Sequence, residues 1–251
     1  MSTGESFIAH LVELRARLMN AVVAVLIVFV GLFHWASKLY TLLAEPLLSK
    51  LPKGGQMIAT DVTTPFFVPL KVALMASFLI TLPYTLYQIW RFVAPGLYEH
   101  EKRLVWPLII ASTTLFFCGM GFAYFVVFPI VFGFITSSAP MGVAVMTDID
   151  KYLSFVLTMF MAFGITFQVP VAVVLLVRMG FVTVAKLREI RPYMVVGAFV
   201  VGAIFTPPDV VSQSMLAVPL WLLYEAGILV AVWVGRKKPE EKMAEDETEA
   251  Q

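Results

Sequence analysis

The sequence has few charged residues and only one cysteine. Charged residues make up 14% of the chain, whereas 60% of its residues are hydrophobic. A water-soluble surface cannot be built around one core with this balance, so the apolar surplus must face lipid. The single cysteine, Cys118, excludes an intramolecular disulfide and a CxxC metal or redox site. The net charge of +1 gives no sign of the basic face that nucleic-acid binding needs.

The motifs of intramembrane enzymes are missing as well. The sequence has no HExxH pair for zinc, no GxSxG elbow and no GxxxxGKS/T loop for nucleotide hydrolysis. Of the 3 histidines only His34 falls inside an expected span, so a serine and a histidine at matching depth are not available. We therefore expect a protein that binds or conducts, without a catalytic site, metal or cofactor.

Long uncharged stretches predict an all-α integral membrane protein, since a spanning helix needs roughly 20 apolar residues. The first stretch is too long for a secretory signal, and we expect it to be retained. Pro207 and Pro208 lack amide donors and interrupt the last stretch, which predicts a turn that includes Asp209. The expected fold is one domain over residues 1–235 with six transmembrane helices, of which the fifth and sixth are short. The expected spans are 18–36, 70–90, 106–135, 152–177, 193–206 and 210–234.

The lysines and arginines are divided unevenly between the two sides. With the amino terminus inside, thirteen of the 18 fall in cytoplasmic segments and five on the opposite side. This asymmetry predicts that both termini lie in the cytoplasm. Residues 236–251 are highly charged and predict a disordered cytoplasmic tail. In the long outer segment 37–69 we expect Pro46 to mark a turn, and the apolar face of residues 40–51 predicts a short surface helix.

Two carboxylates stand out at the expected cytoplasmic face. Glu13 lies just before the first span, and Glu101 lies between the second and the third. Each also has a purely structural explanation. Glu13 can pair with Arg17 one helical turn further on, and Glu101 can pair with a basic neighbour in its own loop.

Polar residues inside the spans are the other candidates. Glu225 in the sixth span is a functional candidate, because a carboxylate in a membrane costs free energy. Gln88, Gln168 and Gln213 are explained more simply as hydrogen-bonding links between helices.

The stretch from Phe92 to Arg103 resembles a loop of the TatC family, the multispanning C subunit of the twin-arginine translocase. Further stretches agree with the family in order along the chain, and the resemblance covers residues 10–233. These stretches are residues 10–15, 57–67, 123–129, 163–170, 191–193 and 206–213.

The resemblance implies a receptor for leader peptides with consecutive arginines, carried on already folded cargo. In the family the acidic residues that match Glu13 and Glu101 receive the arginine pair, and the residue that matches Phe92 shapes the site. A guanidinium group forms bidentate bonds with a carboxylate, which lysine cannot reproduce. The other residues expected at this site are Arg15, Tyr98, Lys102 and Arg103, and Pro95 is expected to turn the loop.

The resemblance also implies partners. These are single-span subunits of the TatA and TatB type, in an oligomeric complex in the bacterial cytoplasmic membrane that uses the proton gradient and contacts membrane lipid. The positions expected to dock a partner helix are Thr206, Gln213 and Gln168. Many relatives carry a glutamate where this chain has Gln168, so a role that requires ionisation cannot operate there.

Two other functions stay open at this point. A secondary transporter or channel would use Gln168 and Glu225 in a polar pathway, although the spans show no inverted repeat. A pure assembly scaffold would bind single-span partners and ignore the leader peptide.

Overall fold

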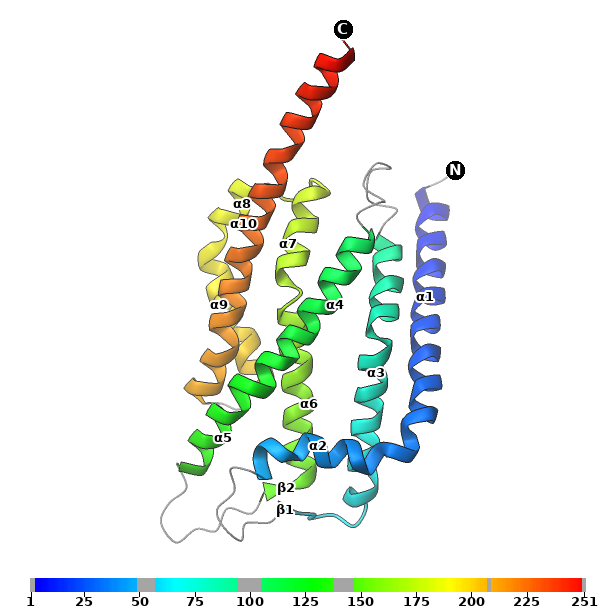
Figure 1. Ribbon diagram of the computed structural model, residues 1–251, viewed down its shortest axis with the longest axis vertical. Coiled ribbons are helices and arrows are strands. Elements are labelled where there is room, and N and C mark those ends of the chain that lie inside the picture. The colour runs from blue at the N-terminus through cyan, green and yellow to red at the C-terminus, as the bar shows by residue number, and fades with distance from the viewer. Residues whose placement is uncertain (1–2, 49–56, 94–104, 138–146, 207–208, 250–251) are drawn as a thin grey trace. The chain divides into compact units, whose positions relative to one another are not determined.

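The computed structural model describes residues 3–48, 57–93, 105–137, 147–206 and 209–249. It is built from helices, apart from two strands of two residues each. The chain forms two compact units, Met1–Ala162 and Phe163–Gln251, which we describe separately. Figure 1 shows the elements in chain order.

Five helices of the described chain are long and apolar enough to cross a membrane, and Arg191–Phe205 is a shorter apolar helix. The expected short fifth helix is therefore confirmed. Its 15 residues extend about 22 Å, less than the roughly 30 Å of a hydrocarbon core. The five long segments are Leu11–Glu45, Thr64–Phe92, Trp106–Phe134, Ile149–Arg178 and Val210–Trp233.

The first unit contains two helices that lie side by side, α1 and α3. A short helix, α2, follows the carboxyl-terminal end of α1 and runs across toward α3 (Figure 1). Tyr152 of α6 donates a hydrogen bond to the Leu43 carbonyl of α2 at 3.0 Å. The elements are α1 Thr3–Leu32, η1 Phe33–Trp35, α2 Ala36–Leu48, β1 Met57–Ile58, α3 Thr64–Val93, α4 Val105–Phe122, η4 Ala123–Val127, α5 Phe128–Ser137, β2 Thr147–Asp148 and α6 Ile149–Thr166.

Proline explains two irregularities of the long spans. Pro129 has no amide hydrogen to offer the preceding turn, and the π-helical segment η4 lies directly before it. The expected fourth span, 152–177, is not one helix, because it is interrupted after Thr166 and resumes with Pro170 in the first turn of α7. The absence of charge predicted this apolar stretch but not its interruption.

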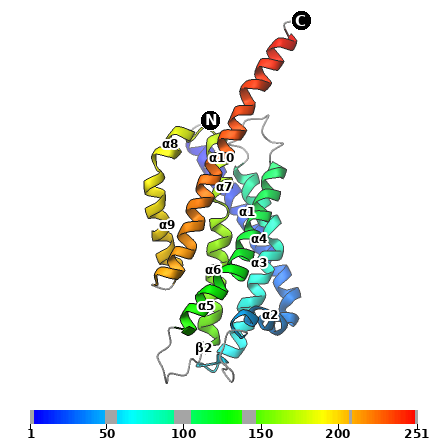
Figure 2. The same ribbon diagram turned by 60° about the vertical axis from the view of Figure 1, so that its left-hand side comes forward.

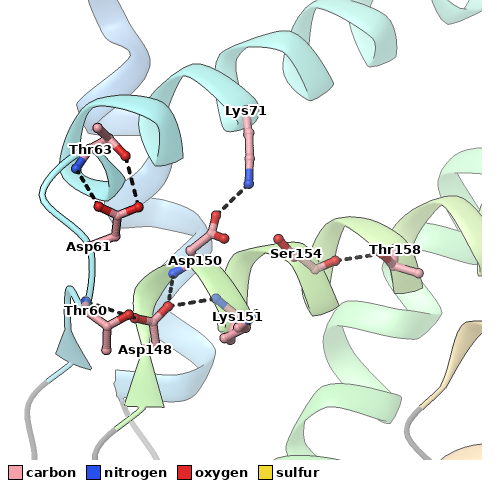
Figure 3. A network of polar contacts seen from close by, with 9 residues as sticks. All are labelled: Thr60, Asp61, Thr63, Lys71, Asp148, Asp150, Lys151, Ser154 and Thr158. Atoms are coloured by element: carbon pink, nitrogen blue, oxygen red, sulfur yellow. Dashed lines mark hydrogen bonds and ion pairs between the residues drawn. The ribbon is translucent and has the colours of Figure 1, made fainter.

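A network of polar contacts joins two distant segments of the first unit (Figure 3). The strands β1 and β2 pair in parallel, with Ile58 opposite Asp148. One carboxylate oxygen of Asp148 accepts bonds from the Thr60 amide at 3.1 Å and its hydroxyl at 2.5 Å, while the other accepts from the amides of Asp150 and Lys151. The Thr60 hydroxyl bond is the largest cause that lowers the pKa of Asp148 from 3.8 to about 2. Lys71 of α3 adds an ion pair with Asp150 at 2.6 Å.

The second unit consists of the remaining helices, with α10 packed against α7 and α9 (Figure 2). Val173, Leu187, Tyr224 and Ile228 form a buried cluster, and the Tyr224 hydroxyl donates to the Leu187 carbonyl at 2.7 Å. The helices are α7 Val169–Arg178, α8 Val184–Glu189, α9 Arg191–Phe205 and α10 Val210–Glu249.

The last helix differs from expectation in two respects. Its apolar segment Val210–Trp233 has 24 residues, so the sixth span is not short. The helix also continues to Glu249 through the segment 236–251 for which the sequence predicted disorder. That segment is rich in lysine, glutamate and alanine, which are good helix formers. The predicted disorder of residues 236–251 and the predicted grouping of residues 1–235 into one domain stay predictions.

Replacing Gly227 with alanine should separate α10 from α7. An added Cβ would lie 2.9 Å from Pro170 Cα and 3.1 Å from Val173 Cβ. We expect Gly227→Ala to lower the free energy of unfolding by about 1–3 kcal/mol, measured by thermal unfolding in detergent. Gly197→Ala is the matched control, because nothing lies within 4 Å of its added Cβ, and it should be neutral or stabilising. Equal effects of the two substitutions would contradict the close packing at Gly227.

The Asp148 network should make the stability of the outer segments depend on acid. Because folding lowers the pKa of Asp148, its ionised form stabilises the fold fully above pH 3.8, and this contribution is lost as the pH falls through about 2. We expect Asp148→Asn to lower the melting temperature at pH 7, with a difference from the wild type that shrinks between pH 4 and 2. A difference that stays constant over this range would show that the charge of Asp148 does not contribute.

Candidate functional site

A charged cluster lies where the first unit brings the amino-terminal part of α1 next to the carboxyl-terminal part of α3 (Figure 1). Arg17 Nε donates to Glu13 Oε1 at 2.9 Å, and Arg17 Nη2 also bonds this oxygen. This confirms the pairing that the spacing of one helical turn predicted. The Glu13 side chain is 37% exposed and that of Arg17 only 16%, so the carboxylate is the more accessible partner.

Gln88 connects this pair to α3. Arg17 Nη1 donates to Gln88 Oε1 at 3.4 Å, across 71 positions of sequence. Gln88 is 7% exposed, so its amide is held in place by the surrounding packing. The interpretation of Gln88 as a link between helices is confirmed by this bond.

A groove of about 140 Å³ opens beside the cluster. Arg17, Thr85 and Gln88 are its polar lining residues, and the remaining side chains are apolar. Phe92, at the end of α3, is among them. The other apolar lining residues are Leu14, Leu18, Ala21 and Ile89. The groove therefore offers apolar contacts to a ligand that reaches the neighbouring carboxylate.

The other residues predicted for this site are placed as follows. Arg15 is exposed and lies two positions from Glu13, about 200° around the helix, so it is not on the face of the cluster. Glu101, Tyr98, Lys102, Arg103 and Pro95 lie outside the described residues.

In the second unit, Gln213 links the start of α10 to α9, and Thr206 closes the end of α9. Gln213 Nε2 donates to the Phe199 carbonyl at 2.9 Å, and the Thr206 hydroxyl donates to the Gly202 carbonyl at 2.8 Å. Gly202 permits the close approach, because an added Cβ would lie 3.0 Å from Gln213 Cγ. Gln168 lies apart from this contact, at the residue that precedes α7.

The residues predicted for turns differ in their surroundings. Asp209 precedes α10, and its carboxylate accepts the Ser212 amide at 2.7 Å, which caps the helix. Pro207 and Pro208 lie outside the described residues. Pro46 lies inside the last turn of α2 instead of in a turn between elements.

The carboxylate of Glu225 has a structural partner. It accepts a bond from Arg191 at 2.5 Å, and the two side chains are 22% and 44% exposed. This pair ties the start of α9 to α10. A separate cavity of about 250 Å³ in the first unit has no charged group among its lining residues, which include Leu42, Met75 and Phe160.

No group of three or more metal-ligating side chains is present in the part of the chain that the structure describes. Five long apolar helices define a multi-pass helical membrane protein. Comparison with known proteins identifies its family.

Residues 9–219 match the family model of the Sec-independent protein translocase protein TatC. A TatC protein of Azotobacter chroococcum is 54% identical over 95% of this chain and 93% of its own length. The Escherichia coli K12 protein is 52% identical over the same shares. A crystal structure of the twin arginine translocase receptor TatC superposes with a TM-score of 0.79 at 39% identity, over 89% of this chain and 98% of the other.

The chain therefore belongs to the TatC family. It is a component of the Sec-independent protein translocase, and it works in a complex with other subunits of that translocase. The predictions of an all-α membrane fold and of a protein without catalytic activity are confirmed, because the family is a translocase component and not an enzyme family.

Removing the carboxylate of Glu225 should affect stability more than transport. The Arg191 pair is partly exposed, so we expect Glu225→Gln to lower the free energy of unfolding by only about 0.5–1 kcal/mol. A double-mutant cycle with Arg191→Gln, measured by unfolding in detergent, should give a coupling energy of similar size. Loss of protein export at unchanged stability would instead assign Glu225 a direct role in transport.

Proposed function

We propose that this chain is the subunit that receives leader peptides with consecutive arginines. Glu13 is one receiving carboxylate, and Glu101 from the loop after α3 is the second. The observation that carries the proposal is the position of Glu13, whose bonded partner Arg17 lines the same groove as Phe92.

The chemistry of the groove suits such a leader. A guanidinium group can form two parallel bonds with a carboxylate, which adds directional specificity to charge attraction. The apolar residues that follow the arginines can bury side chains against Leu14, Leu18 and Phe92. The carboxylate thus fixes the register of the peptide, while apolar burial adds affinity.

The distribution of basic residues supports a location of this site on the side of the membrane where cargo folds. Thirteen of the 18 basic residues fall in segments on the side of the amino terminus, which supports a cytoplasmic location of both termini. The Glu13 end of α1 then faces the cytoplasm of a bacterial inner membrane. The strand β2, which contains Asp148, lies toward the opposite ends of α1 and α3 (Figure 1).

The single-span partner subunits dock on the second unit, at Gln213, Thr206 and Gln168. Gln213 uses its amide nitrogen for Phe199, and its amide oxygen accepts no bond from the residues that the structure describes. That oxygen is available to a donor on a partner helix. The short α9 beside it supports local thinning of the bilayer.

Neutralising either receiving carboxylate should weaken leader binding without unfolding the protein. We expect Glu13→Gln to raise the dissociation constant of a fluorescent twin-arginine peptide roughly 10- to 100-fold, since bonds to charged groups are lost. The measurement uses the protein in phospholipid nanodiscs. Glu101→Ala should abolish export at normal protein abundance.

Glu189→Gln is the matched control, because Glu189 pairs with Lys186 on the exposed face of α8, outside the groove. It should leave the dissociation constant unchanged. Equal binding of the Glu13→Gln variant and the wild type would remove Glu13 from the site. Binding of single-span partners without any binding of the peptide would favour a scaffold.

A further inference from the structure

We infer that Arg17 is an internal ligand of the receptor carboxylate, which a leader arginine must displace before it can form its full contact. The inference rests on the proposed function, because it takes Glu13 as a receiving carboxylate. The inference adds Arg17 as a residue that lowers the apparent affinity of the site, so that only leaders of high intrinsic affinity bind.

Arg17 already offers Glu13 the contact that a leader would bring. Its Nε and Nη2 atoms both bond Glu13 Oε1, and its Nη1 atom donates to the buried Gln88. All three guanidinium nitrogens are therefore engaged within the protein. A leader arginine has the same donors in the same planar arrangement.

The two oxygens of Glu13 are used unequally. Both Arg17 bonds end on Oε1, and no residue of the described chain donates a hydrogen bond to Oε2. An incoming guanidinium can therefore first bond Oε2, while Arg17 stays in place. A bidentate contact needs both oxygens, so it forms only when Arg17 leaves Oε1.

Arg17 competes from the same helix, one turn away from the carboxylate. A tethered group of this kind acts at an effective concentration on the order of millimolar or more. The apparent dissociation constant of a leader is then its intrinsic value divided by the fraction of receptors in which Glu13 is released. Every leader that needs both oxygens loses affinity by the same factor.

Although Arg17 lowers the affinity of all these leaders by the same factor, strong and weak leaders then differ in how much of each is bound in a cell. A leader with two arginines engages a second carboxylate at the same time and keeps enough affinity after the loss. A leader with a lysine and an arginine places its arginine on Glu13 and its lysine on the second carboxylate. It starts weaker, because the ammonium group makes only a point contact there, and the same loss at Glu13 leaves it mostly unbound. Arg17 thus suppresses transport of proteins with chance basic segments.

Binding of two peptides to the full-length protein in phospholipid nanodiscs tests this inference. One peptide carries the arginine pair, and the other carries lysine and arginine. We expect Arg17→Gln to lower the dissociation constants of both peptides by a common factor, roughly three- to tenfold for a partly buried pair. Export of the lysine–arginine cargo should rise, while export of the twin-arginine cargo changes little.

Two variants separate the pair contact from the charge. Arg15→Gln removes the same charge from α1 at a residue without a bond to Glu13 among the described contacts, and it should strengthen binding much less. Arg17→Lys keeps the charge and loses the planar donors, so its effect should lie between those of the wild type and Arg17→Gln.

Two results would overturn the inference about Arg17, and a third would overturn the proposed function. Unchanged or weaker binding by Arg17→Gln would overturn the inference, because Arg17 would then position Glu13 instead of competing for it. Equal gains from Arg15→Gln and Arg17→Gln would also overturn it, in favour of a general charge effect. Failure of the proposed function looks different, because Glu13→Gln would then leave binding of the twin-arginine peptide intact.

Discussion

The cost of leaving a charge unpaired near hydrocarbon governs this structure. The long helices consist mostly of apolar residues, and three pairs of ionisable groups on or beside them bond each other. Glu13 bonds Arg17, Lys71 bonds Asp150, and Arg191 bonds Glu225. The second and third pairs join separate helices, whereas Glu13 and Arg17 lie on the same helix. In each pair the carboxylate is bonded to a cation that another cation can replace. The proposed receptor site uses this replacement at Glu13.

The two ends of the first unit differ in how firmly their contacts are fixed. At one end Asp148 accepts bonds from Thr60 and from two backbone amides, so several donors hold a single side chain. At the other end Glu13 is held by one side chain from its own helix, and one of its oxygens accepts no hydrogen bond from the described residues. The first arrangement suits a structural joint. The second suits an exchange of ligands, which a receptor requires.

Hydropathy predicted most of the fold, because the length of an apolar stretch directly limits what can cross a bilayer. It located the short α9, and the two prolines before Asp209 predicted the turn that precedes α10. The spacing of Glu13 and Arg17 predicted their pair. It missed the contact from Arg17 to Gln88 and that from Thr60 to Asp148, because 71 and 88 positions separate these residues and nothing in the local pattern brings them together. The break after Thr166 was missed because Pro170 is compatible with the first turn of a helix. The family resemblance, rather than any local pattern, supplied Phe92 and Glu101 as site residues.

The most direct test of the account is where a leader touches the receptor. A twin-arginine peptide with a photoreactive residue directly after the arginine pair can be crosslinked in membranes, and the labelled positions can be mapped by mass spectrometry. The account predicts labels on Leu14, Leu18 or Phe92, which line the groove beside Arg17. Labels confined to α9 and α10, or to the cavity around Met75 and Phe160, would contradict it.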